Sequence, residues 1–269
     1  MFEEMRTRFV IGLMTVVSIV SVSLLLQATG NVLLNSLFAM LVFYIVLPVG
    51  ICSYSFNKRG VKLRQVVFYR GTARWLLPVF GLTVLVTASS ISLYWLLLRG
   101  LLSLSPTVVD SLLTQRQLPD ALWYLVAIGF ILAVIAPIAE EFVFREVLLN
   151  QLMAIFGLWK GISLTSLIFA IFHFNIFGSF LFAVVASLLY VKTGNLLLPI
   201  LLHIFNNTFS VYQTFVNPSF LEWLMVKDIN DLYAKAGANL IMLIVSVGLL
   251  IFISLWMGRN LETRQQSIK

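Results

Sequence analysis

Residues 121–156 read ALWYLVAIGFILAVIAPIAEEFVFREVLLNQLMAIF, an almost unbroken apolar run with three glutamates and one arginine in its interior. About 20 apolar residues suffice for an α-helix to cross the hydrocarbon core of a bilayer, so this stretch, 121–138 continuing into 139–156, predicts a membrane-spanning helix. Charged side chains are costly at that depth and mark a functional site by default. The stretch therefore predicts both a membrane fold and the position of a site.

Seven further apolar runs recur along the chain, at 9–26, 32–54, 75–98, 161–176, 177–192, 196–214 and 238–257. Hydrophobic residues make up 60% of the chain and charged residues 11%, with a mean hydropathy of +1.00. A soluble domain carries about 25% charged residues. We therefore predict an all-α, polytopic bundle of about eight transmembrane helices, forming one integral membrane domain over residues 1–269. The connections 100–120 and 215–237 are polar and have room for short interfacial helices.

The formal net charge of +7 is interpreted as a record of topology. Nucleic-acid binding is not expected, because no basic patch is interleaved with exposed aromatic residues. With the N-terminus in the cytoplasm, the inside loops hold 13 Lys and Arg and the outside loops 4, with Arg145 set aside. Both termini are therefore expected in the cytoplasm. Residues 9–26 are expected to be a retained first helix, because no small-residue cleavage site follows them.

The acidic residues within 136–146 differ in their local partners. Glu141 and Arg145 are spaced i, i+4 and can form an ion pair on one face of the helix. Glu140 lies about 100° away around the helix and lacks that partner, which leaves its carboxylate free for chemistry. Pro137 predicts a kink just before the glutamates. Glu146 is expected to be solvated near the cytoplasmic interface and to take no part in the site.

Both histidines of the chain, His173 and His203, also fall in apolar segments. Phe169 lies one turn before His173, and Asn207 lies one turn after His203. A single intramembrane histidine is more often a helix–helix hydrogen bond than a catalyst, and a helical Glu–Arg pair is more often structural. One unpaired carboxylate, two imidazoles and an amide on three helices at compatible depths exceed what a structural hydrogen bond needs. We therefore expect these elements to converge on a site that opens toward the cytoplasm.

The ordered motifs EExxxR at 140–145, FxxxH at 169–173 and HxxxN at 203–207 resemble the CAAX protease and bacteriocin-processing (CPBP, or Abi) family. The resemblance covers roughly 120–210, which would be the protease core, and it implies an intramembrane glutamate endopeptidase with no covalent enzyme intermediate. It implies that Glu140 activates water, assisted by His173, and that His203 and Asn207 stabilise the oxyanion. Glu141, Arg145 and Phe169 would support the site. The family's substrates are membrane-associated proteins or peptides, some of them lipidated.

Two alternatives remain open. Glu140, His173 and His203 are a ligand set that zinc accepts in catalytic sites, although no HExxH helix is present, so we expect no metal or other cofactor. A non-catalytic transporter, bacteriocin-immunity protein or scaffold could use the same polar cluster to bind a ligand. Short loops and the lack of an organellar targeting segment favour a bacterial plasma membrane. The sequence does not indicate the substrate or the oligomeric state.

Overall fold

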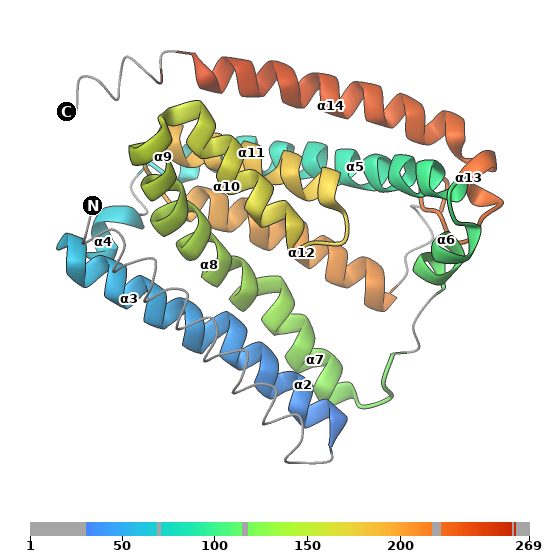
Figure 1. Ribbon diagram of the computed structural model, residues 1–269, viewed down its shortest axis with the longest axis horizontal. Coiled ribbons are helices and arrows are strands. Elements are labelled where there is room, and N and C mark those ends of the chain that lie inside the picture. Colours follow the sequence, from blue (N-terminus) through green and yellow to red (C-terminus); the bar gives the residue numbers. More distant parts are fainter. Residues whose placement is uncertain (1–30, 69–70, 115–117, 217–221, 260, 262–269) are drawn as a thin grey trace.

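A computed structural model describes residues 31–68, 71–114, 118–216, 222–259 and 261, and every regular element among them is a helix (Figure 1). The predicted helix 9–26 lies outside these residues. The α-helices are α2 (Val32–Leu41), α3 (Leu47–Arg59), α4 (Leu63–Val66), α5 (Ala73–Leu102), α6 (Pro106–Leu113), α7 (Leu122–Phe130), α8 (Ala136–Glu141), α9 (Asn150–Phe156), α10 (Leu158–Ile171), α11 (Ile176–Thr193), α12 (Leu197–Val216), α13 (Asp231–Ala234) and α14 (Ala236–Gly258). Three π-helical segments, η1 (Val42–Val46), η2 (Ile131–Ile135) and η3 (Phe142–Leu149), join some of these into longer helices.

Five of the described helices are long and apolar enough to cross a membrane, namely Val32–Arg59, Ala73–Leu102, Leu122–Phe156, Ile176–Thr193 and Ala236–Gly258. α10 is apolar but shorter. α12 has 20 residues and carries the His–Asn motif. The short helices α6 and α13 occupy the two polar connections, as expected. The prediction of an all-α polytopic bundle is confirmed.

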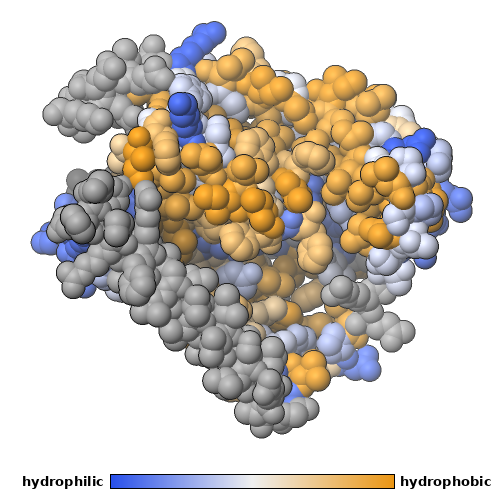
Figure 2. All heavy atoms as spheres, viewed as in Figure 1, coloured by the Kyte–Doolittle hydropathy of each residue, from blue (hydrophilic) through white to orange (hydrophobic). Residues whose placement is uncertain are grey.

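α5 lies at the centre of the bundle and packs against α11, α12 and α14, while α10 pairs with α11 (Figure 1). The core between these helices is made of aliphatic side chains such as Val79, Leu82, Ile162 and Leu202, which are almost fully buried. Large hydrophobic side chains also cover the outside of the bundle, as Figure 2 shows for one face. An apolar exterior is what a chain solvated by lipid requires, and it agrees with an integral membrane protein.

The two ends of the bundle differ in charge. At one end Lys192 donates to the Arg259 carbonyl and links α11 to α14, and at the other the Trp95 indole donates to the Leu232 carbonyl and links α5 to α13. The first end carries eight of the described basic residues, Lys58, Arg59, Lys62, Arg64, Arg74, Lys160, Lys192 and Arg259. The second carries Arg99, Lys227 and Lys235. The imbalance has the sign that the sequence predicted, whereas its assignment to the cytoplasm remains a prediction.

The helix that carries the three glutamates runs unbroken from Leu122 to Phe156. Its irregularity consists of two π-helical segments, η2 directly before Ala136 and Pro137, and η3 directly after Glu141. A π segment widens the helix and releases backbone carbonyls from their usual partners, as happens often at functional sites. The kink expected at Pro137 remains a prediction, and what the structure shows there is a π-helical segment within a continuous helix.

Candidate functional site

Three side chains from separate parts of the chain meet near the middle of the bundle. Glu140 lies on α8, His173 in the turn between α10 and α11, and His203 on α12. The Oε2 atom of Glu140 is 3.8 Å from Nε2 of His173 and 3.8 Å from Nε2 of His203. This oxygen is buried and, among the described residues, has no hydrogen-bond partner. The structure thus brings together the free carboxylate and both histidines that the sequence singled out.

His203 is held by the second glutamate of the pair. Its Nδ1 lies 2.8 Å from Oε1 of Glu141, and both side chains are almost completely buried. A carboxylate accepts hydrogen bonds, so the imidazole donates from Nδ1 and turns Nε2 toward Glu140. Glu141 therefore fixes the tautomer and the direction of the His203 ring.

The Arg145 guanidinium neutralises the Glu141 carboxylate. Its Nε lies 3.0 Å from Oε2 of Glu141, which confirms the predicted i, i+4 pair, although the geometry is that of an ion pair and not of an aligned hydrogen bond. Both side chains are fully buried. The guanidinium carbon sits over the ring of Phe169 at 4.6 Å and over that of Phe182 at 5.8 Å. Aromatic faces attract a desolvated cation, so these rings help to hold the charge in place.

His173 lies just past the end of α10, which corrects the expectation of a helix over 161–176. The carbonyl of Phe169 receives the backbone N–H of Phe172 at 3.3 Å and contacts Nδ1 of His173 at 2.8 Å, so it no longer continues the α-helical pattern. A carbonyl only accepts, hence His173 also donates from Nδ1 and presents Nε2 to Glu140. The rings of Phe169 and His173 stack with centroids 4.4 Å apart, so the two side chains lie together although His173 is outside the helix.

The turn that follows His173 is anchored to α5. Asn175 accepts from the backbone N–H of Gly178 and donates to both the carbonyl and the hydroxyl of Ser90, at 2.7 and 2.9 Å. A Cβ added at Gly178 would lie 2.5 Å from the Asn175 amide and the Ser90 hydroxyl, so this close approach requires glycine. The position of the His173 ring therefore depends on this three-residue contact.

Asn207 lies one turn beyond His203 on α12. Its amide Nδ2 donates to the carbonyl of Leu132 at 3.0 Å, within the π-helical segment η2. The bond links the HxxxN motif to the helix of Glu140. It uses one of the two N–H groups of the Asn207 amide, and the second does not take part in this bond. No hydrogen bond joins Asn207 to Glu140 among the described residues, so the role of Asn207 toward an oxyanion remains a prediction.

Glu146 is buried, and the expectation that it is solvated is wrong. Only 2% of the residue is exposed, and its carboxylate lies 2.9 Å from the Arg59 guanidinium and accepts a hydrogen bond from the Tyr190 hydroxyl. Asn150 adds bonds to the Glu146 carbonyl and to the Tyr190 oxygen. Buried charge is tolerated when it is paired in this way.

The sequence did not indicate Phe182, Tyr190 and Arg59 as neighbours of the buried charges. Phe182 contacts His203 with ring centroids 4.7 Å apart, yet it is one of 22 phenylalanines and has no distinguishing spacing. Arg59 was counted only as a topological charge. Among the described residues, no group of three or more His, Cys, Asp or Glu side chains is arranged to hold a metal ion.

Comparisons with known proteins match the part of the chain that carries the candidate site. Residues 122–209, which contain every candidate site residue, match the family model described as type II CAAX prenyl endopeptidase Rce1-like. The chain is 30% identical over 163 residues to the membrane-embedded CAAX protease MroQ of Staphylococcus aureus, covering 55% of this chain and 60% of that protein. It is 29% identical over 173 residues to an uncharacterized 24.3 kDa protein of Escherichia coli, covering 56% of this chain and 76% of that protein.

The chain thus spans about 60% of the length of the staphylococcal relative. No solved structure matches. The family model and the staphylococcal match agree with the ordered EExxxR, FxxxH and HxxxN motifs that converge in the fold. The region that carries the candidate site is therefore similar to CAAX protease-like membrane proteins, the family that the three motifs resemble.

Proposed function

We propose that this protein is an intramembrane endopeptidase that hydrolyses peptide bonds of a membrane-associated substrate through a water activated by Glu140. The observation that carries the proposal is the buried Oε2 atom of Glu140, which has no hydrogen-bond partner in the described part of the chain and lies 3.8 Å from two imidazole nitrogens. A buried carboxylate oxygen that makes no hydrogen bond within the fold is free to accept a proton in a reaction. Its neighbours Glu141 and Glu146 are both paired and lack that freedom.

The spacing suits a water molecule shared by the three groups. A separation of 3.8 Å exceeds a direct hydrogen bond, and one bridging water makes contacts of ordinary length to groups at such distances. With Nδ1 of His173 donating to the Phe169 carbonyl, its neutral Nε2 and the Glu140 carboxylate are both acceptors, so a donor is needed between them. Water supplies two protons for this purpose.

The reaction then balances without a covalent enzyme intermediate. The water oxygen attacks the carbonyl carbon of the scissile peptide while Glu140 accepts a water proton, assisted by His173. The carbonyl oxygen becomes an oxyanion, which Asn207 and a protonated His203 stabilise by donating hydrogen bonds. The C–N bond breaks as Glu140 returns its proton to the leaving amine. Glu141 stabilises the positive charge that His203 carries in this sequence.

The surroundings support a substrate within the bilayer. The chain is proposed to lie in a bacterial plasma membrane with both termini in the cytoplasm, on the grounds of its basic end and short loops. A protein or peptide substrate, lipidated or not, reaches the site along the membrane.

Reconstitution in proteoliposomes tests this function. Glu140→Ala is expected to abolish cleavage of a membrane peptide library, whereas Asp120→Ala, which removes an exposed carboxylate before α7, retains it. Glu146→Ala is not a suitable control, because its side chain is buried and paired. Equal cleavage by Glu140→Ala and wild type would refute the proposal. A phenotype that survives loss of both histidines would favour a transporter, immunity protein or scaffold.

The same purified protein distinguishes zinc chemistry from a glutamate mechanism. A stoichiometric metal whose removal abolishes cleavage would favour zinc held by Glu140, His173 and His203. Comparison of membrane peptides from wild-type and Glu140→Ala cells would then identify the substrate as the product that disappears.

A further inference from the structure

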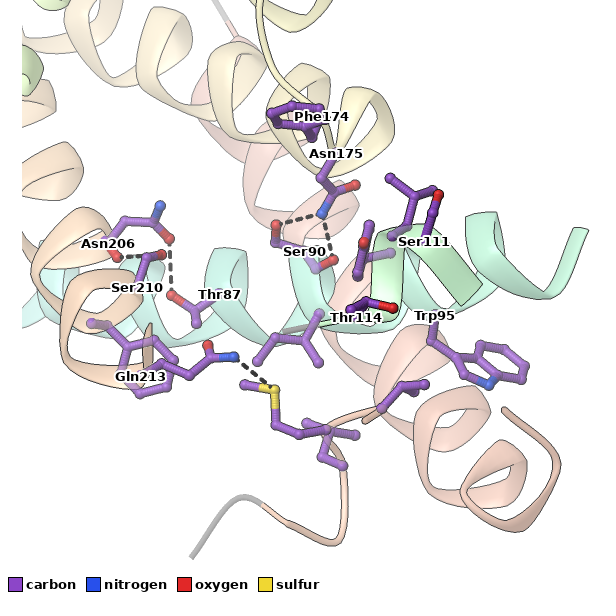
Figure 3. Close-up of a pocket in the computed structure, with 17 residues that line it drawn as sticks. Thr87, Ser90, Trp95, Ser111, Thr114, Phe174, Asn175, Asn206, Ser210 and Gln213 are labelled. Carbon is purple, nitrogen blue, oxygen red and sulfur yellow. Dashed lines mark hydrogen bonds between the residues drawn. The ribbon is translucent and has the colours of Figure 1, made fainter. Parts of the chain in front are cut away.

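A polar pocket of about 510 Å³ lies beside the candidate site, between α5, α6, α12 and the segment that precedes α13 (Figure 3). Phe174 and Asn175, which line it, directly follow His173 in the chain. Asn206, on the opposite wall, lies one turn after His203. Pockets of this size bind small molecules or short peptide segments. The pocket therefore adjoins the catalytic candidates through two of the elements that position them.

The polar side chains that line the pocket are hydroxyls and amides, and none of the described lining residues is charged. They are Thr87, Ser90, Asn175, Asn206, Ser210 and Gln213, with further hydroxyls from Tyr94, Ser111 and Thr114. Neutral polar groups at membrane depth are costly to expose to lipid and are found where they face water or a ligand. Their number and chemistry indicate a pocket that receives uncharged hydrogen-bonding groups.

A continuous stripe on α12 connects this pocket with the site. His203, Asn206, Asn207, Ser210 and Gln213 follow the spacing of one helix face, from the Glu140 contact outward. His203 contacts Glu140 at 3.8 Å at one end of the stripe. Gln213 contacts Met225 at its other end, 3.0 Å from the thioether. A chain bound along this stripe would pass directly from the pocket to the reacting groups.

Two amides in the stripe have hydrogen-bonding capacity to spare. Asn206 accepts from the Thr87 hydroxyl at 3.0 Å, and among the described residues the other end of its amide has no partner. Gln213 donates only to the Met225 sulfur, a weak acceptor, and the other end of its amide is likewise without a partner in the described part of the chain. Each amide thus keeps one polar atom for a ligand.

The distance between these two amides matches an extended peptide. Seven residues along an α-helix correspond to a rise of about 10 Å. An extended chain covers about 3.3–3.6 Å per residue, so about three residues span the interval. A peptide backbone offers both N–H and C=O groups at regular intervals, which suits one free donor and one free acceptor.

We propose that this pocket is the substrate subsite that binds a neutral, extended segment of about three residues next to the scissile bond, with Asn206 and Gln213 as specificity-determining residues. The inference rests on the proposed endopeptidase function. A charged substrate side chain would lose its hydration here without gaining a counter-ion. The subsite therefore selects against charge in this segment.

The pocket also gives the segment a direction. It lies at the end of the bundle with α6 and α13, away from the eight basic residues at the other end (Figure 1). If both termini are cytoplasmic, the segment approaches from the outer side, opposite to the cytoplasmic opening that the sequence suggested.

Peptide binding to the inactive full-length protein Glu140→Gln in nanodiscs tests the subsite independently of cleavage. The probes are three fluorescent decapeptides that differ only in a central tripeptide, Ala-Ser-Ala, Asp-Ser-Asp or Lys-Ser-Lys. We expect the neutral peptide to bind at least about tenfold more tightly than either charged one. Asn206→Leu and Gln213→Leu should each weaken it about tenfold, whereas Thr214→Val, an exposed neighbour outside the pocket, should not.

A charge introduced into the pocket provides the most direct test. Gln213→Glu should invert the ranking, so that the Lys-Ser-Lys peptide binds best. An unchanged ranking, or no binding of any probe, would overturn the subsite. Wild-type protein assayed for cleavage of the same peptides separates the two proposals. If the ranking of the three peptides by affinity inverts but no peptide is cleaved, the endopeptidase proposal is refuted and the subsite is supported. If the peptides are cleaved but Gln213→Glu does not change their ranking, the subsite is refuted and the endopeptidase is supported.

Discussion

Glu140 and Glu146 lie six positions apart on one helix, yet their surroundings differ. Glu140 faces two imidazoles at 3.8 Å, and its Oε2 has no hydrogen-bond partner among the described residues. Glu146 contacts a guanidinium at 2.9 Å and accepts from the Tyr190 hydroxyl. The Glu146 carboxylate thus makes structural contacts with both of its oxygens, whereas Oε2 of Glu140 makes no hydrogen bond among the described residues.

The difference separates stability from function along a single helix. Removing one partner of a buried, paired charge leaves the other uncompensated, so the Glu146 cluster is expected to stabilise the fold. An unsatisfied buried carboxylate costs stability and persists where a site needs it. Glu141 lies between these cases, because it is paired with Arg145 and also orients His203.

The strongest test of this contrast is Glu140→Gln, which keeps the shape of the side chain and removes the base. Turnover should fall about 10²–10⁴-fold, the usual contribution of a general base. Thermal unfolding in detergent should be nearly unchanged, because among the described residues no hydrogen bond to Oε2 is lost. Asp120→Asn serves as the control. A large drop in the unfolding temperature of Glu140→Gln would mean that this carboxylate is structural after all.

Asn207→Ala should have the next largest effect on turnover. Loss of one oxyanion donor costs about 10²–10³-fold in kcat, with KM nearly constant. The same change removes the 3.0 Å bond to Leu132, so the unfolding temperature must be measured beside the kinetics. The substitution Asn206→Ala, on the adjacent residue, should instead act mainly on KM. If Asn207→Ala loses stability in proportion to activity, Asn207 holds the helices together and does not contact the oxyanion.

Local relations in this molecule and the convergence of Glu140 with both histidines were predictable from the sequence, whereas the distant partners of Glu146 were not. The Glu141–Arg145 pair follows from i, i+4 spacing and is present. The same spacing placed Phe169 and His173 on one face, and their rings stack there. The partners of Glu146 lie 87 and 44 positions away, at Arg59 and Tyr190. No periodic pattern identifies them, because Tyr190 lies in an apolar helix and Arg59 near a loop.

Helix ends were predictable only where the backbone itself determines them. α11 ends at Thr193 and is capped by Gly194, whose φ of 67° is a left-handed conformation that favours glycine. α10 ends earlier than its apolar pattern suggests, because the His173 side chain competes for the Phe169 carbonyl. The site thus disturbs the regular pattern from which the helix was predicted.

Glu146→Gln tests the structural half of the contrast. The amide keeps the shape of the carboxylate but loses the charge that pairs with Arg59, which is about a third exposed. The free energy of unfolding should fall by about 1–3 kcal/mol, equivalent to about 2–4 °C in unfolding temperature for each kcal/mol. Turnover of the folded protein should stay close to wild type, since this carboxylate is not in contact with His173 or His203. Exposed Glu222→Gln is the matched control. Loss of turnover at an unchanged unfolding temperature would show that Glu146 acts in the site, and the contrast between a structural Glu146 and a catalytic Glu140 would be wrong.

Tyr190→Phe should have the smallest effect, because it removes one donor from Glu146 and leaves the contact with Arg59 intact. A single hydrogen bond contributes about 0.5–1.5 kcal/mol to stability, or somewhat more when it is charge-assisted. If the two partners act on one carboxylate, the combined variant Tyr190→Phe with Arg59→Gln should lose an amount that differs from the sum of the single losses, by at least about 0.5 kcal/mol. Simple additivity would show that each group stabilises the fold independently of Glu146. The contacts with Tyr190 and Arg59 would then not distinguish the Glu146 carboxylate from that of Glu140. Pairing could not explain why only Glu140 is available for chemistry.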